Sequence, residues 1–304
     1  MWELPVGMHV LERGWLSSNC VLFSDGATTA LVDSGYYSHA DQTLAMVEAI
    51  LGDRPLDALI NTHLHSDHCG GNATLQARYR TLLTLIPPGQ ANHVKNWDPV
   101  ALSYAPTGQH CPAFKFTSTL KSGERIDLGQ EEWEIYSAPG HDPDAIILFE
   151  PHKRVLISGD ALWERGFGVI FPELEGMDGF AEVAATLDQI EQLAPRIVIP
   201  GHGRVFGYTP QIIDYARQRL MGFRDDPVKH ARHAAKVLLK FKLLEQQSQK
   251  LDQFIDWSLS TPCLTQIHRS FFHSQSPSNW AMALCDDLVK SGAARLAGSD
   301  IFNA

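Results

Sequence analysis

The chain has 304 residues, of which 44% are hydrophobic and 20% are charged, a balance typical of a globular protein with a full core. Its formal net charge of −10 argues against general affinity for nucleic acids, which usually requires a basic face. The sequence shows neither a signal-peptide pattern nor an apolar stretch of membrane-spanning length. Because the five cysteines are odd in number and scattered, we expect reduced thiols in a cytoplasmic protein without membrane association.

The first third of the chain predicts alternating strands and helices, as in an α/β fold. The expected strands span residues 6–12, 19–24, 28–33, 56–60 and 81–86. The expected helices span residues 40–51 and 72–79. A third, short helix is expected after the turn Pro87-Pro88-Gly89 and ends at residue 95. Asp33 ends the third strand, where it could either support a metal-binding histidine or cap the helix that follows.

Residues 61–71, with the sequence Asn-Thr-His-Leu-His-Ser-Asp-His-Cys-Gly-Gly, gather three imidazoles and one carboxylate within six positions. Such side chains bind borderline divalent metals such as Zn, Fe or Mn. His63 and His65 are two positions apart and point to one side of an extended backbone. Asp67 and His68 are adjacent and must diverge, which favours a second metal. The segment follows a strand, and the carboxyl end of a strand is where α/β proteins bind ligands.

The middle of the chain predicts two hairpins, a helix and a further strand, and three metal-capable side chains follow strand ends. The hairpin strands are expected at residues 125–129 with 132–138 and at residues 145–149 with 154–157. An amphipathic helix over residues 179–193 precedes a strand over residues 196–199. His141, Asp160 and His202 each follow one of these strands after a short glycine-containing turn. Together with the cluster over residues 61–71, these three side chains after strand ends indicate one converging site.

Two segments match no regular pattern. Residues 96–124 place aromatic side chains among prolines and glycines, which favours an irregular loop that lines the substrate cleft. The apolar loop over residues 166–172 could form a wall of that cleft or a buried connector. Cys69 is expected to be a buried thiol, although its position beside His68 also allows a ligand role.

The last quarter of the chain is expected to form a separate, mainly helical region. A helix starting at Thr209-Pro210 ends at Arg224-Asp225-Asp226-Pro227, so we divide the chain into residues 1–225 and 226–304. The expected helices of the second region span residues 229–245, 251–259, 262–272 and 278–291. The basic stretch from Lys229 to Lys242 could contact nucleic acid, but the acidity of the chain favours packing or homodimer formation.

The metal-capable segments resemble the signatures of the metallo-β-lactamase-fold superfamily over roughly residues 5 to 225. The first matches the His-x-His-x-Asp-His motif, and the others match at Ala138-Pro139-Gly140-His141, Ser158-Gly159-Asp160 and Pro200-Gly201-His202-Gly203. The resemblance implies a four-layer αββα sandwich of α/β class, here with a mainly helical C-terminal appendage that is similar to the winged-helix unit of some members. It implies seven metal ligands: His63, His65, Asp67, His68, His141, Asp160 and His202.

The resemblance also implies how these ligands divide. The first two histidines and His141 would hold one metal, Asp67, His68 and His202 would hold the other, and Asp160 would bridge them. Two divalent cations roughly 3.5–4 Å apart can lower the pKa of a shared water from about 15.7 to near 7, which generates a bridging hydroxide. Asp67 and Asp160 are the expected catalytic carboxylates, and zinc is the first expectation for both ions, with Fe or Mn as alternatives.

Asp160 narrows the activity that the resemblance implies, because true metallo-β-lactamases typically carry Cys or Ser there. The complete ligand set instead resembles the glyoxalase II-type thioesterases, the lactonases and the phosphodiesterase or nuclease branches. Asp142 and Asp144 depart from the commoner His-Thr-Pro-Gly-His pattern, and their negative charge favours uncharged or cationic leaving groups over polyanionic phosphate substrates.

Three hypotheses follow. The first is a dinuclear metal-dependent hydrolase that cleaves a small ester, thioester or lactone. The second is a metal-dependent phosphodiesterase or nuclease guided by residues 229–242, whose binding would weaken steeply with salt. The third is a metal-binding regulatory protein with vestigial hydrolysis, against which the intact ligand set argues.

Overall fold

The computed structural model describes residues 3–304, and these form two compact units. Unit 1 contains the described residues up to Leu102 together with His110–Leu220. Unit 2 contains Ser103–Gln109 and Met221–Ala304. The division into residues 1–225 and 226–304 that the sequence suggests stays a prediction. Each unit is described by itself below.

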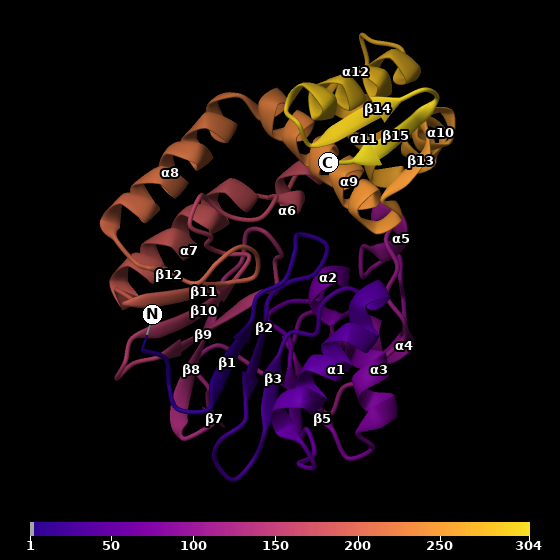
Figure 1. Ribbon diagram of the computed structural model, residues 1–304. Coiled ribbons are helices and arrows are strands. Elements are labelled where there is room, and N and C mark those ends of the chain that lie inside the picture. Colours follow the sequence, from indigo (N-terminus) through magenta and orange to yellow (C-terminus); the bar gives the residue numbers. More distant parts are fainter. Residues whose placement is uncertain (1–2) are drawn as a thin grey trace. The chain divides into compact units, whose positions relative to one another are not determined.

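Unit 1 is built on two six-stranded sheets, here called sheet 1 and sheet 2 (Figure 1). Sheet 1 has the order β1-β2-β3-β4-β5-β6, with antiparallel pairs as far as β3 and parallel pairs beyond it. Its strands are β1 (Met8–Leu11), β2 (Cys20–Phe23), β3 (Ala30–Val32), β4 (Ala58–Ile60), β5 (Leu83–Ile86) and β6 (Ser118–Thr119).

Sheet 2 has the order β12-β11-β10-β9-β8-β7, and only β10 and β11 pair in parallel. Its strands are β7 (Arg125–Leu128), β8 (Glu131–Ser137), β9 (Ile146–Glu150), β10 (Val155–Gly159), β11 (Ile197–Pro200) and β12 (Phe206–Gly207). The expected hairpins are therefore β7–β8 and β9–β10, with boundaries within a few residues of the predicted ones.

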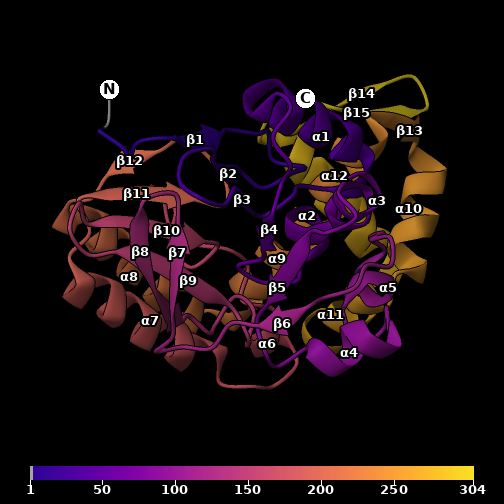
Figure 2. The same cartoon turned by 90° about the horizontal axis from the view of Figure 1, so that it is seen from below.

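Helices cover the outer faces of both sheets, which gives the four-layer αββα sandwich (Figures 1 and 2). On sheet 1, Val47 and Leu75 pack with Leu22, Leu31 and their neighbours in one buried cluster. On sheet 2, Thr186 and Gln189 bond to the chain at the end of β8. The helices of unit 1 are η1 (Tyr37–His39), α1 (Ala40–Leu51), α2 (Ser66–Cys69), α3 (Asn72–Arg78), α4 (Ala91–Asn96), α6 (Phe171–Leu174), α7 (Gly179–Leu193) and the first part of α8 (Pro210–Asp225).

The main core lies between the two sheets, because each strand places alternate side chains on the inner face. Sheet 1 contributes Val21, Phe23 and Val32, and sheet 2 contributes Trp133 and Ile157 to the same buried cluster. The rings of Phe23 and Trp133 meet edge to face with centroids 5.5 Å apart. This apolar contact fixes the sheets to one another, so the strand ends that carry the polar loops are held at one rim.

The segment 96–124 corrects one expectation, because it is more ordered than an irregular cleft loop. Ser118 and Thr119 form β6, which extends sheet 1 in parallel with β5. Tyr104 and Phe114 are buried, so these aromatic side chains pack inside the protein, and the expectation that the segment lines the substrate cleft stays a prediction. Tyr104 begins the short helix α5 (Tyr104–Thr107).

Unit 2 combines four helices with a small antiparallel sheet of order β13-β15-β14. α5 also belongs to it and packs against α11. The remaining elements of unit 2 are α9 (Pro227–Gln246), β13 (Ser248–Lys250), α10 (Leu251–Ser260), α11 (Pro262–Phe271), α12 (Pro277–Lys290), β14 (Ala294–Ala297) and β15 (Asp300–Asn303). The hairpin β14–β15 lies at the position where a winged-helix unit would have its wing. The similarity of this region to a winged-helix unit stays a prediction.

Among residues 3–304, every helix is too short or too polar to span a bilayer.

Candidate metal centre

The seven side chains that the sequence singles out as ligands meet at one rim of unit 1. His63, His65, Asp67 and His68 lie on the turn after β4 and on the short helix α2. His141, Asp160 and His202 follow β8, β10 and β11 of sheet 2. Three groups among these residues have their donor atoms within 4.8 Å of one another: His63 with His65 and His141, His63 with His68 and Asp160, and Asp67 with His68 and His202.

The first group, here called the three-histidine half-site, consists of His63, His65 and His141. Nδ1 of His65 lies 2.8 Å from Nε2 of His141. Nδ1 of His141 donates to the carbonyl oxygen of Val169 at 2.5 Å, which leaves Nε2 available as a ligand. The loop 166–172 is thus a buried connector that orients a histidine.

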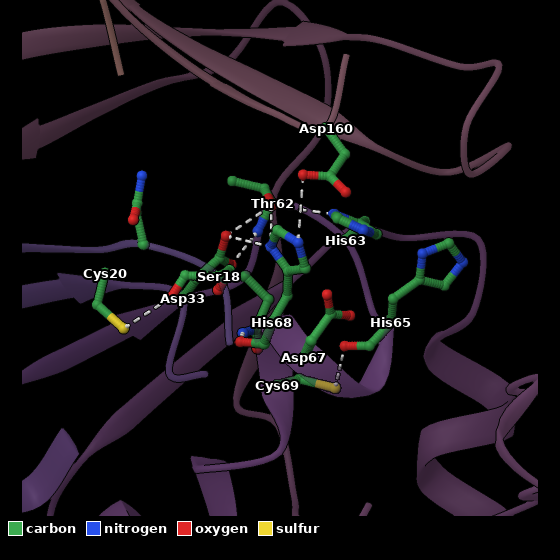
Figure 3. A network of polar contacts seen from close by, with 12 residues as sticks. Ser18, Cys20, Asp33, Thr62, His63, His65, Asp67, His68, Cys69 and Asp160 are labelled. Carbon is green, nitrogen blue, oxygen red and sulfur yellow. Dashed lines mark hydrogen bonds and ion pairs between the residues drawn. The ribbon is translucent and has the colours of Figure 1, made fainter. Parts of the chain in front are cut away.

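The second group, here called the aspartate half-site, consists of Asp67, His68 and His202. Nε2 of His202 lies 3.0 Å from Oδ2 of Asp67. Nδ1 of His68 donates to Oδ2 of Asp33 at 2.7 Å, so Nε2 of His68 faces the centre (Figure 3). This contact answers the question that the sequence left open, because Asp33 supports a histidine of the cluster.

Asp160 lies between the two half-sites. Its Oδ2 is 3.5 Å from Nε2 of His141 and 3.8 Å from Nε2 of His202, so one oxygen faces a histidine of each half-site. Its Oδ1 lies 3.5 Å from Nε2 of His68. This placement is what a carboxylate shared by two cations requires.

Asp33 also reaches the three-histidine half-site through Thr62. The Thr62 hydroxyl donates to Oδ2 of Asp33 at 2.8 Å and lies 3.1 Å from Nδ1 of His63, whose N–H it can accept (Figure 3). The backbone N–H of Thr62 donates to Oδ1 of Asp33 at 2.9 Å. Asp33 has φ = 60°, a left-handed conformation that is uncommon outside glycine. These bonds hold the residue there, and a single carboxylate orients histidines of both groups.

Burial and mutual charge shift the protonation of the cluster. Burial lowers the pKa of His65 and of His141 to about 4 in each case, and it also holds the pKa of His63 well below its usual value. These imidazoles are therefore neutral at pH 7, the state in which they bind metal. Burial alone would raise the pKa of Asp160, but His202, His68 and His141 hold it well below its usual range. The carboxylate is therefore ionised.

The donor set fits divalent metal. Among the side chains of residues 3–304, none forms a well-aligned hydrogen bond with the buried Nε2 atoms of His63 and His68. Buried polar nitrogens normally have a partner, and imidazole nitrogens aimed at ionised carboxylates match the ligands of zinc and iron. His63, His68 and Asp160 form one of the three groups whose donor atoms converge.

Two glycines allow the ligand loops to approach one another. A Cβ on Gly168 would lie 2.4 Å from Nδ1 of His141, and a Cβ on Gly201 would lie 2.2 Å from Oδ1 of Asp160. The β1–β2 connection fixes the same loops, because Ser18 donates to the carbonyl of Asp67 and Asn19 to that of Gly201. The site is therefore positioned by backbone contacts as well as by its ligands.

Comparison with known proteins places this site in a family. The family model of the metallo-beta-lactamase superfamily matches residues 13–202, which is more than half of the chain. The chain belongs to the metallo-beta-lactamase superfamily. As expected for this superfamily, it is a metal-dependent hydrolase whose His and Asp clusters suit divalent cations.

Curated relatives within the superfamily include named hydrolases. A hydroxyacylglutathione hydrolase from Synechococcus sp. (strain JA-3-3Ab) is 26% identical over 236 residues, which is 77% of this chain and 80% of that protein. An acyl-coenzyme A thioesterase from Bos taurus is 24% identical over 163 residues, covering 51% of this chain and 58% of the relative.

The solved structures of superfamily members extend the likeness in fold to the whole chain. A metallo-beta-lactamase family protein from Thermus thermophilus aligns over 98% of this chain and 99% of its own, with a TM-score of 0.58 and 17% identity. At this identity the alignment shows the fold alone, and the αββα sandwich with its C-terminal helices is that fold.

Three aromatic residues lie beside the cluster, and two of them, Trp15 and Trp163, were not identified from the sequence. The Trp15 ring stacks on His202 at an interplanar angle of 8° with centroids 5.4 Å apart, and Trp163 meets the same imidazole edge to face at 5.6 Å. Phe171 meets His65 edge to face at 5.8 Å. Trp15 lies in a connection whose pattern carries no signal for this role, whereas Phe171 belongs to the loop over residues 166–172 that the sequence offered as a cleft wall.

Asp142 is a buried acidic residue beside the three-histidine half-site. Its Oδ2 lies 3.7 Å from Nε2 of His65 and accepts from Nε2 of Gln90 at 3.2 Å. Burial raises the pKa of Asp142, and the buried position together with Asp142 raises that of Asp144. Of the two acidic residues expected near the metals, Asp142 is thus beside the half-site, and its Oδ1 accepts from the backbone N–H of Asp144 at 2.7 Å. Cys69 is a buried thiol, as expected, and its Sγ lies 3.8 Å from that of Cys111.

Proposed function

We propose that the chain is a dinuclear zinc hydrolase that cleaves a small, uncharged ester, thioester or lactone. The observation that carries this proposal is the position of Asp160, one oxygen of which faces a histidine of each half-site. His63, His65 and His141 would hold one ion, Asp67, His68 and His202 the other, and Asp160 would be shared.

The metals supply the chemistry that the side chains lack: two bound cations lower the pKa of a shared water to about 7 and polarise the scissile carbonyl. The residues of the chain create the conditions for it. Asp67 and Asp160 are ionised and offset the positive charge of the ions, because neighbouring imidazoles lower the pKa of both. Asp33, Thr62 and the carbonyl of Val169 orient the imidazoles.

The charge around the site supports an uncharged substrate. Asp142 adds an acidic group beside His65, where its charge would repel a phosphate. The names of the relatives, a hydroxyacylglutathione hydrolase and an acyl-coenzyme A thioesterase, make thioesters the first class to examine. Asp160 in place of Cys or Ser argues against β-lactams.

The nucleic-acid alternative loses support from unit 2 itself. Within the stretch from Lys229 to Lys242, Arg232 pairs with Asp287 at 2.8 Å and Lys242 with Glu245 at 2.7 Å. Lys240 donates to backbone and side-chain oxygens near the C-terminus. These cations are partly neutralised inside the unit, so they offer less charge for phosphate contacts.

The test combines elemental analysis with a substrate panel. We expect two metal ions per chain and hydrolysis of thioesters, aryl esters or lactones that a chelator abolishes and added zinc restores. Bis(p-nitrophenyl) phosphate serves as the contrasting substrate. One ion per chain would contradict the dinuclear site, and turnover confined to the phosphodiester would favour the second hypothesis.

A further inference from the structure

Trp163 makes a direct bond to the carboxylate that both half-sites face. Its indole Nε1 donates to Oδ1 of Asp160 at 3.1 Å. The two residues are three positions apart on the turn that follows β10. Trp163 ends the hydrophobic stretch Ala-Leu-Trp, in which a side chain ordinarily serves packing alone. The hydrogen bond to Asp160 indicates that Trp163 also orients this carboxylate.

The bond distinguishes the two oxygens of Asp160. The terminal torsion of an aspartate is broad and nearly two-fold, so the carboxylate can turn without large cost when nothing holds it. With Oδ1 bonded to the indole, Oδ2 is the oxygen that lies 3.5 Å from Nε2 of His141 and 3.8 Å from Nε2 of His202. The indole therefore selects which oxygen can be shared.

The indole itself is held from several sides. The backbone N–H of Trp163 donates to the carbonyl of Gly166 at 2.7 Å, and Gly168 donates to the carbonyl of Asp160 at 2.9 Å, which closes the turn. The ring packs edge to face on Trp15 at 5.4 Å and on His202 at 5.6 Å. Because backbone and ring are both fixed, the N–H direction is set before any ligand arrives.

We propose that Trp163 is a positioning residue for Asp160, whose indole N–H holds the carboxylate so that one oxygen serves both metal ions. The proposal rests on the dinuclear site proposed above. A phenylalanine at this position would keep one aromatic ring beside His202 but lose the N–H donor and the second ring of the indole. Partners of this kind, one step removed from the metal, typically change metal affinity by about 10- to 100-fold.

The test compares Trp163→Phe with the wild type and with Trp15→Phe as the matched control. Both variants replace an indole that touches His202, and only the first removes a hydrogen bond to Asp160. Zinc affinity is measured by competition with a chromophoric chelator, and the Co²⁺-substituted proteins are compared by visible absorption. We expect W163F to lower the affinity for at least one of the two zinc ions by about 10- to 100-fold and to change the Co²⁺ spectrum. W15F should keep the zinc affinity and the Co²⁺ spectrum near those of the wild type.

A second substitution isolates the donor if W163F folds poorly. Replacing Trp163 with β-(3-benzothienyl)alanine keeps the bicyclic shape and puts sulfur in place of N–H. We expect the same loss of zinc affinity from it. Unchanged affinity and an unchanged Co²⁺ spectrum would overturn the proposal, and equal losses in W163F and W15F would assign the effect to packing around His202.

These readouts separate the proposal from the function on which it rests. A wild-type protein that binds two metals without hydrolysing any ester, thioester or lactone would contradict the proposed function and still allow the affinities to be compared. A wild-type protein that binds one metal would contradict the shared role of Asp160 and with it this proposal.

Discussion

The two half-sites are built from the same pair of sheets but differ in charge and in how their histidines are held. The three-histidine half-site has neutral imidazoles, one of which donates to the carbonyl of Val169. The aspartate half-site contains the Asp67 carboxylate, and its His68 donates to a second carboxylate, that of Asp33, at 2.7 Å. A carboxylate behind an imidazole makes it a more basic ligand. The aspartate half-site is therefore richer in negative charge.

The difference teaches that, in the proposed dinuclear site, the two cations would not be held equally. Burial lowers the pKa of His65 and His141 to about 4, whereas Asp33 and Asp160 outweigh burial and raise the pKa of His68 well above its usual value. Binding a cation at His68 must therefore displace a proton, while the other two imidazoles are already neutral. The substitutions below separate these contributions, from the largest expected effect to the smallest.

The largest effect is expected from Asp160→Asn, which affects both half-sites at once. The amide keeps the size of the carboxylate but loses its negative charge between the cations. Because such metals supply several kcal/mol of transition-state stabilisation, we expect kcat to fall by at least about 10³-fold. Steady-state kinetics and metal content measured together check this, and a variant that keeps both ions and near-normal turnover would contradict the shared role.

Gly168→Ala should damage the three-histidine half-site, and Gly201→Ala should damage the aspartate half-site together with the shared Asp160. The added methyl group would lie 2.4 Å from Nδ1 of His141 in the first variant. In the second it would lie 2.2 Å from Oδ1 of Asp160 and 2.8 Å from Cε1 of His68. We expect each variant to lose about 1–3 kcal/mol in the free energy of unfolding and to bind metal less tightly.

Gly14→Ala is the matched control for both, because a Cβ there meets no atom within 4 Å among the described residues. Isothermal titration with zinc, alongside denaturant unfolding, distinguishes the three variants. If G168A and G201A bind zinc as G14A does, the close approach of the backbone to the ligands is not needed for the site.

Asp33→Asn and Asp142→Asn compare the carboxylates behind the two half-sites. Asp33 bonds directly to His68, whereas Oδ2 of Asp142 stays 3.7 Å from Nε2 of His65. We expect D33N to weaken zinc binding by about 10- to 100-fold and D142N to weaken it less. Chelator competition measures both, and a larger loss in D142N would reverse the comparison.

The smallest effect is expected from Thr62→Val, which removes the hydroxyl between Asp33 and His63 and keeps the shape. His68 keeps its 2.7 Å bond to Asp33 and loses only a long 3.4 Å contact with the hydroxyl, so the three-histidine half-site loses the stronger orienting contact. We expect less than about a 10-fold loss of affinity for one zinc equivalent. A loss at both equivalents would mean that Thr62 is needed to keep Asp33 in place.

The ligand segments were predictable because their signal is local. The His-x-His-x-Asp-His spacing and the short turns after strands identify candidates without a partner, and the helix expected over residues 40–51 is α1. Other features depend on contacts that the local sequence does not show. Asp33 bonds to His68 and β6 pairs with β5, both far along the chain, and Trp163 bonds to Asp160 around a turn. The local patterns of Asp33, β6 and Trp163 are those of a helix cap, a loop and a packing residue.

The placement of the ligands on both sheets has a consequence for the lifetime of the protein. Each ion would connect a loop of sheet 1 to a loop of sheet 2. An ion that binds only the folded chain adds about 2.7 kcal/mol to the free energy of unfolding when its concentration is 100 times its Kd. Metal supply would then govern abundance as well as turnover, because the metal-free chain opens more often and is cleared sooner by proteases.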